Sequence, residues 1–359
     1  SQTHEEKMNP KRYTILLLLT LALACSKDGT GPEDPGSTEI PPAAGELDPF
    51  QQNTLLGRGI NLGNALEGPS EGEWGVTLER YFFEEIAAAG FNSVRIPIRW
   101  SAHAPESAPY TIDPAFLSRV NWAIDQAFAN NLLVIINFHH YDEIFADPGA
   151  QRERFLSLWG QVAEYFSQRD GKLIFEVLNE PHDNLRGDGW NLLLADAITL
   201  IRQSNPGRTL MAGPDQYNSI GALGNFQLPA DDNMIVTVHY YSPFQFTHQG
   251  AEWVDGSNAW LGTTWLGTPD QRSAVQADLG AARNWGTANN RPLNLGEFGA
   301  YSRADMNSRA TWTTFVARSA EGMNMSWSYW EFCSGFGAYD NDARVWRTQL
   351  LNALIPLTP

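Results

Sequence analysis

The feature that most constrains the fold is a regular alternation of short apolar runs with longer amphipathic stretches, which begins at Gly57 and continues almost to the end of the chain. Several runs, such as LLVIINF and KLIFEVL, are apolar on both faces. Two apolar faces are typical of parallel strands that are covered by helices. The expected strands span residues 57–61, 93–98, 132–138, 173–178, 209–213, 234–239, 292–296 and 325–330.

Amphipathic stretches between these runs predict the helices that would connect parallel strands. They span residues 77–89, 114–130, 152–167, 190–203, 271–289 and 309–321. Eight strands that alternate with helices predict an α/β fold of the (β/α)₈ (TIM) barrel type, which needs roughly 250 residues plus insertions. The alternative, an open doubly wound sheet, would place a glycine-rich phosphate loop after its first strand, and the sequence has none there.

The negative net charge of the chain argues against a polyanionic partner. Its 41 acidic and 24 basic residues give a net charge of −17, which repels phosphate backbones, so we expect no nucleic-acid partner. A neutral substrate such as a sugar fits better. The two cysteines, Cys25 and Cys333, allow at most one disulfide and no cysteine-rich metal site. We expect neither a metal nor a cofactor, and we expect a monomer.

The segment from Met8 to Cys25 has the order of a secretory signal peptide. Lys11 and Arg12 precede an apolar run over residues 15–24, and the small residue Ala24 stands directly before Cys25. The run is too short to span a bilayer, which takes about 20 apolar residues. Its end, LALAC, resembles a bacterial lipoprotein box, which implies cleavage before Cys25 and a lipid on the cysteine sulfur. A plain cleaved signal peptide is the alternative.

Three segments are therefore expected: a signal peptide over residues 1–25, a tether over residues 26–47 and a catalytic domain over residues 48–359. The tether consists of Pro, Gly, Ser, Thr and acidic residues without apolar periodicity, a composition typical of disorder. We expect secretion across the inner membrane and a location on the outer membrane or cell surface. Contact with the membrane would be made only through the lipid on Cys25.

Polar side chains stand at the ends of seven of the eight expected strands. Because the active site of such a barrel lies at the carboxyl ends of its strands, these side chains are expected to converge on one rim. They are Asn61, Asn64, Arg95, His139, His140, Asn179, Glu180, His239, Tyr241, Glu297 and Trp330.

Two glutamates among these residues predict the chemistry. Glu180 ends the fourth strand in VLNEP, where the preceding apolar run favours a raised pKa, and Glu297 ends the seventh in LNLGEFG. Either one alone could equally be a structural or solvated acid. Two carboxylates on opposite sides of one rim, however, are what glycoside hydrolysis requires: one donates a proton and the other acts as nucleophile.

Several motifs carry a resemblance to a known family. LNEP, GEFG, FHHY, HYYSPF and YWEF resemble glycoside hydrolase family 5, a family of retaining (β/α)₈ enzymes. GRGINLGNALE, RIPIRW, FTHQGAEW and WEFCSGFG resemble in particular its thermophile-type bacterial endo-β-1,4-glucanases. The resemblance implies a double displacement with Glu180 as acid/base and Glu297 as nucleophile. It implies β-1,4-glucan substrates: cellulose, mixed-linkage glucan and glucomannan.

The resemblance also implies supporting roles. Arg95 and Tyr241 would be partners of Glu297 that keep it ionised, and Asn179 would bind the sugar 2-OH. The family places Asn64, Glu67 and Pro97 at the cleft.

Aromatic and imidazole rings offer further candidates. His139 and His140 are adjacent on one expected strand, so their side chains should point to opposite faces, which disfavours a metal site. His239 is expected at the site because it lies two residues before Tyr241. Trp253 and Trp330 are expected to stack on sugar rings, with Trp253 in a polar stretch of three exposed indoles that includes Trp260 and Trp265.

Three functions remain open at this point. An endo-β-1,4-glucanase leads; an endo-β-1,4-mannanase or a dual glucanase/mannanase would use the same two carboxylates. A non-catalytic carbohydrate-binding lipoprotein is the remote alternative, and it has no reason to keep both acids.

Overall fold

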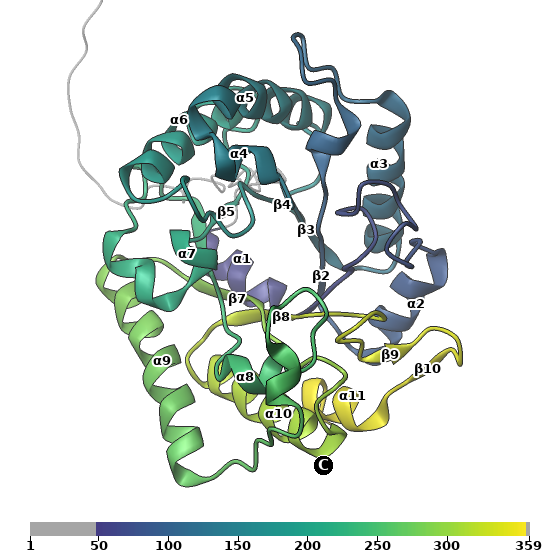
Figure 1. Cartoon of the computed structure of the whole chain (residues 1–359). Coiled ribbons are helices and arrows are strands. Elements are labelled where there is room, and N and C mark those ends of the chain that lie inside the picture. Colours follow the sequence, from purple (N-terminus) through teal and green to yellow (C-terminus); the bar gives the residue numbers. More distant parts are fainter. Residues whose placement is uncertain (1–47, 357–359) are drawn as a thin grey trace, which may run out of the picture. The chain divides into compact units, whose positions relative to one another are not determined.

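A closed barrel of eight parallel strands forms the centre of the computed structural model, which describes residues 48–356 (Figure 1). The strands follow one another around the barrel in chain order, and β8 pairs with β1. This arrangement confirms the predicted (β/α)₈ fold. The strands are β1 (Arg58–Asn61), β2 (Ser93–Ile96), β3 (Leu133–Asn137), β4 (Leu173–Glu176), β5 (Leu210–Ala212), β6 (Met234–His239), β7 (Leu293–Glu297) and β8 (Ser326–Tyr329).

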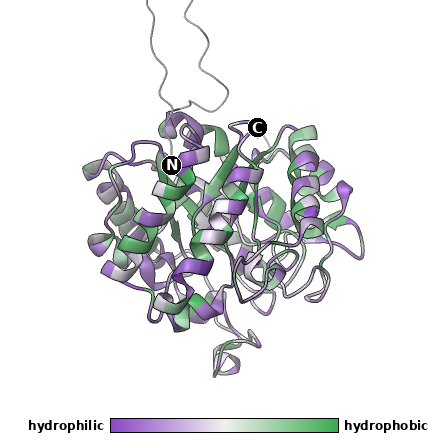
Figure 2. Cartoon of the chain, turned by 90° about the horizontal axis from the view of Figure 1, so that it is seen from above, coloured by the Kyte–Doolittle hydropathy of each residue, from purple (hydrophilic) through white to green (hydrophobic). Residues whose placement is uncertain are grey.

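Helices surround the barrel, and hydrophilic and hydrophobic residues alternate along them (Figure 2). Three of the long helices, α3 (Pro114–Ala129), α5 (Pro148–Tyr165) and α9 (Pro269–Ala288), each begin with an aspartate or threonine N-cap that is followed by proline. The helices are α1 (Pro49–Leu56), α2 (Arg80–Ala89), α3 (Pro114–Ala129), α4 (Asp142–Ala146), α5 (Pro148–Tyr165), α6 (Asp188–Ser204), α7 (Asp215–Asn218), α8 (Phe244–Thr247), α9 (Pro269–Ala288), α10 (Met306–Gly322) and α11 (Thr348–Leu354).

Most strands end before the predicted position, because the residues at the carboxyl rim no longer pair with the neighbouring strands. The second strand stops at Ile96, before Pro97, whose nitrogen has no hydrogen to donate. The sequence pattern also missed α1 and the antiparallel pair β9 (Tyr339–Asp340) and β10 (Val345–Trp346). These elements are short and lie outside the alternation from which the barrel was predicted.

The inside of the barrel is layered. Its lower part is apolar: Leu56 at the end of α1 joins a cluster with Leu133, Ile135, Ile174, Met211 and Ile235. Polar groups fill the part above it, where Asn61, Arg95 and Glu176 are completely buried. Because buried polar groups need hydrogen-bond partners, this upper layer must be a connected network, and it forms the floor of the candidate site.

Some expectations fall outside the described part of the chain. The signal peptide, Cys25 and the tether precede residue 48 and lie outside the described residues. Between residues 48 and 356, no helix is both long and apolar enough to cross a membrane.

Candidate active site

A fully buried arginine organises the carboxyl end of the barrel. Arg95 on β2 donates through Nε and Nη2 to both oxygens of Glu176 on β4, at 2.6 and 2.7 Å. Its Nη1 donates to Asn61 and to Glu297, each at 2.8 Å, and its Nη2 also donates to Asn179 at 2.7 Å. One guanidinium on β2 thus fixes side chains from β1, from β4 and its carboxyl end, and from β7.

Glu297, the last residue of β7, is held by donors on both oxygens. Arg95 donates to Oε1 and the Tyr241 hydroxyl donates to Oε2 at 3.0 Å. The expected partners are therefore in place. These two donors do not lower the pKa of Glu297 overall, because burial raises that pKa while the charge of Arg95 opposes the rise. The expectation neglected burial: Glu297 is only 5% exposed.

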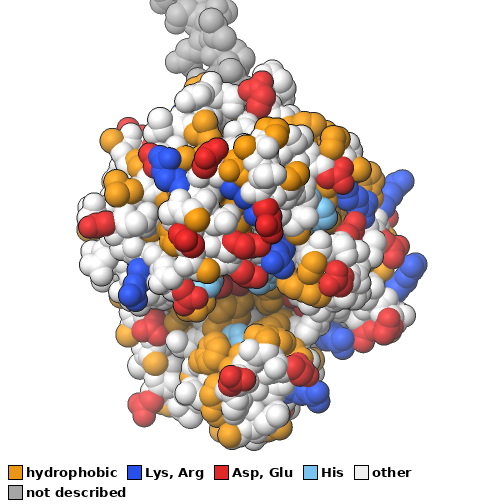
Figure 3. Space-filling model, turned by 45° about the horizontal axis from the view of Figure 1, so that its top comes forward, with side chains coloured by type: hydrophobic (Ala, Val, Ile, Leu, Met, Phe, Trp, Pro, Cys, Tyr) orange, Lys and Arg blue, Asp and Glu red, His pale blue; other side chains and the backbone are white. Residues whose placement is uncertain are grey.

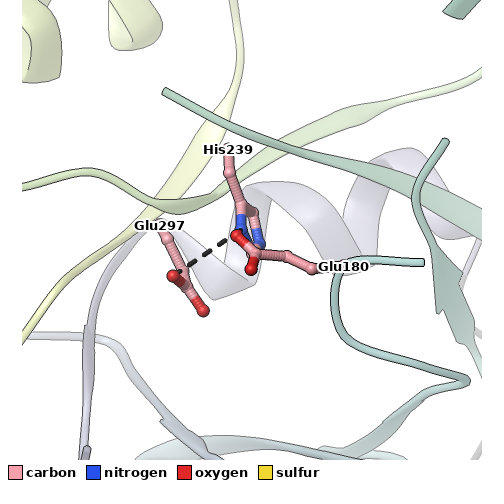
Figure 4. Close-up of side chains that lie close together, drawn as sticks. All are labelled: Glu180, His239 and Glu297. Carbon is pink, nitrogen blue, oxygen red and sulfur yellow. Dashed lines mark hydrogen bonds and ion pairs between the residues drawn. The ribbon is translucent and has the colours of Figure 1, made fainter. Parts of the chain in front are cut away.

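Glu180 lies opposite Glu297 in a different environment. Its side chain keeps 24% of its surface exposed, and its Oε1 lies 2.6 Å from Nδ1 of His239. Burial raises the pKa of Glu180 to about 7, against the lowering effect of the Arg95 charge. The same His239 nitrogen lies 3.6 Å from Oε2 of Glu297. The three side chains point toward one another (Figure 4), and one oxygen of each glutamate lies within 4.8 Å of the other.

One face of the molecule is hollowed. Figure 3 shows a depression with hydrophobic side chains on its floor and histidine and acidic side chains along its edge. A hollow of this kind leaves room for a substrate, and the Glu180 side chain, 24% exposed, is open to solvent.

His139 and His140 do not point to opposite faces, so that prediction was wrong. Their ring centroids lie 4.6 Å apart, because β3 ends at Asn137 and His140 has a left-handed backbone (φ 47°), so strand alternation no longer applies. Asn137 Nδ2 lies 3.2 Å from Nδ1 of His139, and burial lowers the pKa of His139 well below its usual value. Both rings are therefore neutral donors or acceptors beside the cleft, since burial also lowers the pKa of His140 to about 4.

The tryptophans divide between cleft and core. Trp330 stacks on His139 with centroids 5.8 Å apart, and Trp253 is 60% exposed. Trp260 is half-buried. Trp265 is only 1% exposed, so the expectation of three exposed indoles was wrong. Trp265 packs against Phe315 of α10, which the polar character of its own loop did not reveal.

The three remaining candidates lie on the loops after β1 and β2. Pro97 is buried directly after β2, and Asn64 is partly buried with a left-handed backbone. Both oxygens of Glu67 accept from the backbone amides of Asn64 and Ala65, and Glu67 is 1% exposed. Burial raises the pKa of Glu67 to about 8. Glu67 therefore fixes the shape of the loop that carries Asn64.

Several residues of the site were not found from the sequence. Glu176 sits within an apolar run, LIFEVL, which gives no sign that its carboxylate pairs with Arg95. Glu331 follows Trp330 and accepts from the backbone amides of Cys333, Ser334 and Phe336, and burial raises its pKa to about 7. His182 has Nδ1 at 2.5 Å from the backbone carbonyl oxygen of Glu180 and stacks on Tyr217.

The spacing of the central groups also bears on metal binding. Between residues 48 and 356, only one group of three or more histidine, cysteine, aspartate or glutamate side chains has ligand atoms close enough together to hold a metal ion. It consists of Glu180, His239 and Glu297. Arg95 and Tyr241 already donate to the oxygens of Glu297, which suits a carboxylate pair that acts without a metal. The absence of a metal stays a prediction.

Comparison with known proteins places this chain in a family. Residues 55–335 match the family described as cellulase (glycosyl hydrolase family 5). Endoglucanase H of Acetivibrio thermocellus is 37% identical over a match that covers 88% of this chain and 35% of that relative. Endoglucanase B of Clostridium cellulovorans is 28% identical, with 80% and 70% covered. The chain thus spans about a third of the length of Endoglucanase H.

Solved structures agree with this match. Cel5A of Thermotoga maritima in complex with mannotriose superposes with a TM-score of 0.85 at 48% identity, and the match covers 86% of this chain and 100% of that one. The cellobiose complex of the same enzyme gives a TM-score of 0.85 at 49% identity, with the same coverage of both chains.

The buried position of Arg95 leads to a prediction about stability. Arg95→Met should lower the free energy of unfolding by about 3–5 kcal/mol, because it leaves Glu176 buried without its cation. Urea denaturation at neutral pH measures the change. Arg152→Met is the matched control: it removes an exposed ion pair with Asp196 and should cost under about 1 kcal/mol. Equal, small losses in both variants would contradict the account of the network.

Proposed function

Because the chain belongs to glycosyl hydrolase family 5, we propose that it is a retaining endo-β-1,4-glucanase that cleaves cellulose, mixed-linkage glucan and glucomannan. Glu180 acts as acid/base and Glu297 as nucleophile. The observation that carries the proposal is the close approach of the two carboxylates, since one oxygen of each lies within 4.8 Å of the other. Retaining enzymes have carboxyl groups about 5–5.5 Å apart, whereas inverting enzymes leave about 6.5–9.5 Å for a water molecule.

The different surroundings of the two glutamates support their assignment. Glu297 receives hydrogen bonds from Arg95 and Tyr241, which stabilise its ionised form as a nucleophile. Glu180 has a pKa near 7 and is partly open to the cleft, so it can hold a proton at working pH and lose it during turnover.

Two steps follow from this assignment. In the first, a Glu297 oxygen forms a bond to the anomeric carbon while the glycosidic bond breaks, and Glu180 gives its proton to the leaving oxygen. In the second, Glu180 takes a proton from water, whose oxygen attacks the anomeric carbon and releases Glu297 as a carboxylate.

Other side chains of the site bind and orient the sugar. The side-chain oxygen Oδ1 of Asn179 accepts a hydrogen bond from Arg95. The side-chain nitrogen Nδ2 therefore points away from the guanidinium and can donate to the sugar 2-OH at the cleavage point. Trp330 and the exposed Trp253 provide faces for sugar rings. His139 and His140, both neutral, donate to or accept from hydroxyl groups.

A dual glucanase/mannanase activity is the second candidate. One observation favours it: the Thermotoga maritima Cel5A structures, at 48% and 49% identity, hold mannotriose and cellobiose respectively. Reducing-sugar release from barley glucan, carboxymethyl cellulose and galactomannan, measured side by side, separates the two functions. A non-catalytic binder would release none.

We propose in addition that the enzyme is exported and tethered to the outer membrane or cell surface by a lipid on Cys25, for the sequence reasons given above. Mass spectrometry of the mature N-terminus in a Gram-negative host tests this. An unmodified terminus at any other residue would contradict it.

The acidity of the two glutamates predicts a bell-shaped dependence of kcat/KM on pH. Activity should fall as pH rises through about 7, because Glu180 then loses the proton that it must donate. It should fall again as pH drops through the pKa of Glu297, which burial raises, because the nucleophile becomes protonated. In Glu180→Ala, assayed with dinitrophenyl cellobioside, the fall near pH 7 should be absent. A fall that persists in this variant would assign the limb to another group.

Replacement of each glutamate should have a different consequence. Glu180→Ala should form its glycosyl-enzyme almost normally from dinitrophenyl cellobioside, which needs no protonation, and should then stall. Azide needs no deprotonation, so it should restore turnover and yield the β-glycosyl azide. Glu297→Ala forms no covalent intermediate, and any azide rescue should give the α-product by direct displacement. Product analysis by NMR distinguishes the two. Exchanged products would reverse the assigned roles.

A further inference from the structure

Asn218 ends α7, a turn with an unusual backbone between β5 and β6. Gln216, Tyr217 and Asn218 all have left-handed φ angles, of 53°, 63° and 54°. Asp215 accepts from the Gly187 amide at 2.7 Å, and the Tyr217 amide donates to the Pro181 carbonyl at 3.2 Å. The turn is thus fastened to the segment that follows Glu180. It leaves Gln216 and Tyr217 exposed and directs Asn218 into the barrel, where it is completely buried.

The buried amide of Asn218 meets the far side of the His239 ring. Its Nδ2 lies 3.2 Å from Nε2 of His239, while Nδ1 of the same ring lies 2.6 Å from Glu180 and 3.6 Å from Glu297. Gly213 makes room for this amide, because a Cβ there would lie 2.5 Å from Oδ1 of Asn218. His239 therefore stands between one amide and two carboxyl groups.

These contacts define which ring nitrogen carries the hydrogen. Burial lowers the pKa of His239 to about 4, so the ring is neutral at working pH and has one donor and one acceptor nitrogen. Because carboxyl oxygens of Glu180 and Glu297 lie near Nδ1 of His239, this nitrogen carries the hydrogen and donates it. Nε2 is then the acceptor, and the Asn218 amide group is the donor that satisfies it.

We propose that Asn218 is a positioning residue that holds His239 in the tautomer with its hydrogen on Nδ1, so that His239 donates to Oε1 of Glu180. The inference rests on the proposed role of Glu180 as acid/base. Because Oε1 is occupied as an acceptor, the proton of the acid resides on Oε2, from which it passes to the leaving oxygen. The opposite tautomer would present a bare Nδ1, which would accept that proton and turn it away from the substrate.

The tautomer can be measured directly. Long-range ¹H–¹⁵N correlation spectra of histidine-labelled enzyme separate protonated from bare ring nitrogens, and the spectrum of His239→Gln identifies the His239 signals. The intact enzyme should show His239 protonated at Nδ1 and bare at Nε2. A hydrogen on Nε2 in the intact enzyme would overturn the proposal, whatever the kinetic role of Glu180.

A pair of variants in the same turn tests the cause. Asn218→Gly keeps the left-handed backbone without strain and removes the amide, and water in its place can donate or accept, so the tautomers should mix. Gln216→Gly, on an exposed neighbour with the same φ, should leave His239 unchanged. If the tautomer of Asn218→Gly is the same as in the intact enzyme, Asn218 does not hold it.

Kinetics provide a second readout. Asn218→Gly should lower kcat about fivefold on cello-oligosaccharides, which need protonation of the leaving oxygen, the effect of losing one neutral hydrogen bond. Formation of the glycosyl-enzyme from dinitrophenyl cellobioside should be nearly unchanged. Equal losses on both substrates would show a general structural role and would contradict the proposal.

Discussion

The buried guanidinium of Arg95 is the interaction on which the rest of the site depends. A charge at this depth is stable only when it is paired and fully hydrogen-bonded, and two carboxylates and two amide oxygens meet that need. The network spans β1, β2, β4 and β7. It therefore fixes the geometry of the barrel rim at the point where its polar layer begins, above the apolar cluster that ends with Leu56 of α1.

The division of labour between the two glutamates follows from their position relative to this cation. Glu297 contacts Arg95 directly, and the contact opposes the effect of burial on its pKa. Glu180 has His239 as its hydrogen-bond partner, and burial leaves its pKa near 7. Two chemically identical side chains thus have different partners: Glu297 accepts directly from a fixed charge, and Glu180 lies against a neutral ring.

The sequence was most informative where a periodic pattern decides structure. Alternating apolar runs predicted the barrel, and because the carboxyl ends of parallel strands share one rim, they also predicted that Glu180 and Glu297 would meet. Glu176 could not be found in this way, since its partner lies 81 residues away and its neighbours are apolar. His139 and His140 were misplaced because a left-handed residue after β3 ends the alternation that the prediction assumed. Asn218 depends on three successive left-handed residues without glycine, which no local propensity indicates.

The central claim is that two carboxylates this close act by double displacement. The most direct test follows the hydrolysis of cellopentaose by ¹H NMR from the first seconds, before mutarotation mixes the anomers. The account predicts that the newly formed reducing end appears first as the β-anomer, with the α-anomer growing in only as mutarotation proceeds. An α-anomer formed first would mean inversion, and Glu297 would not be the nucleophile.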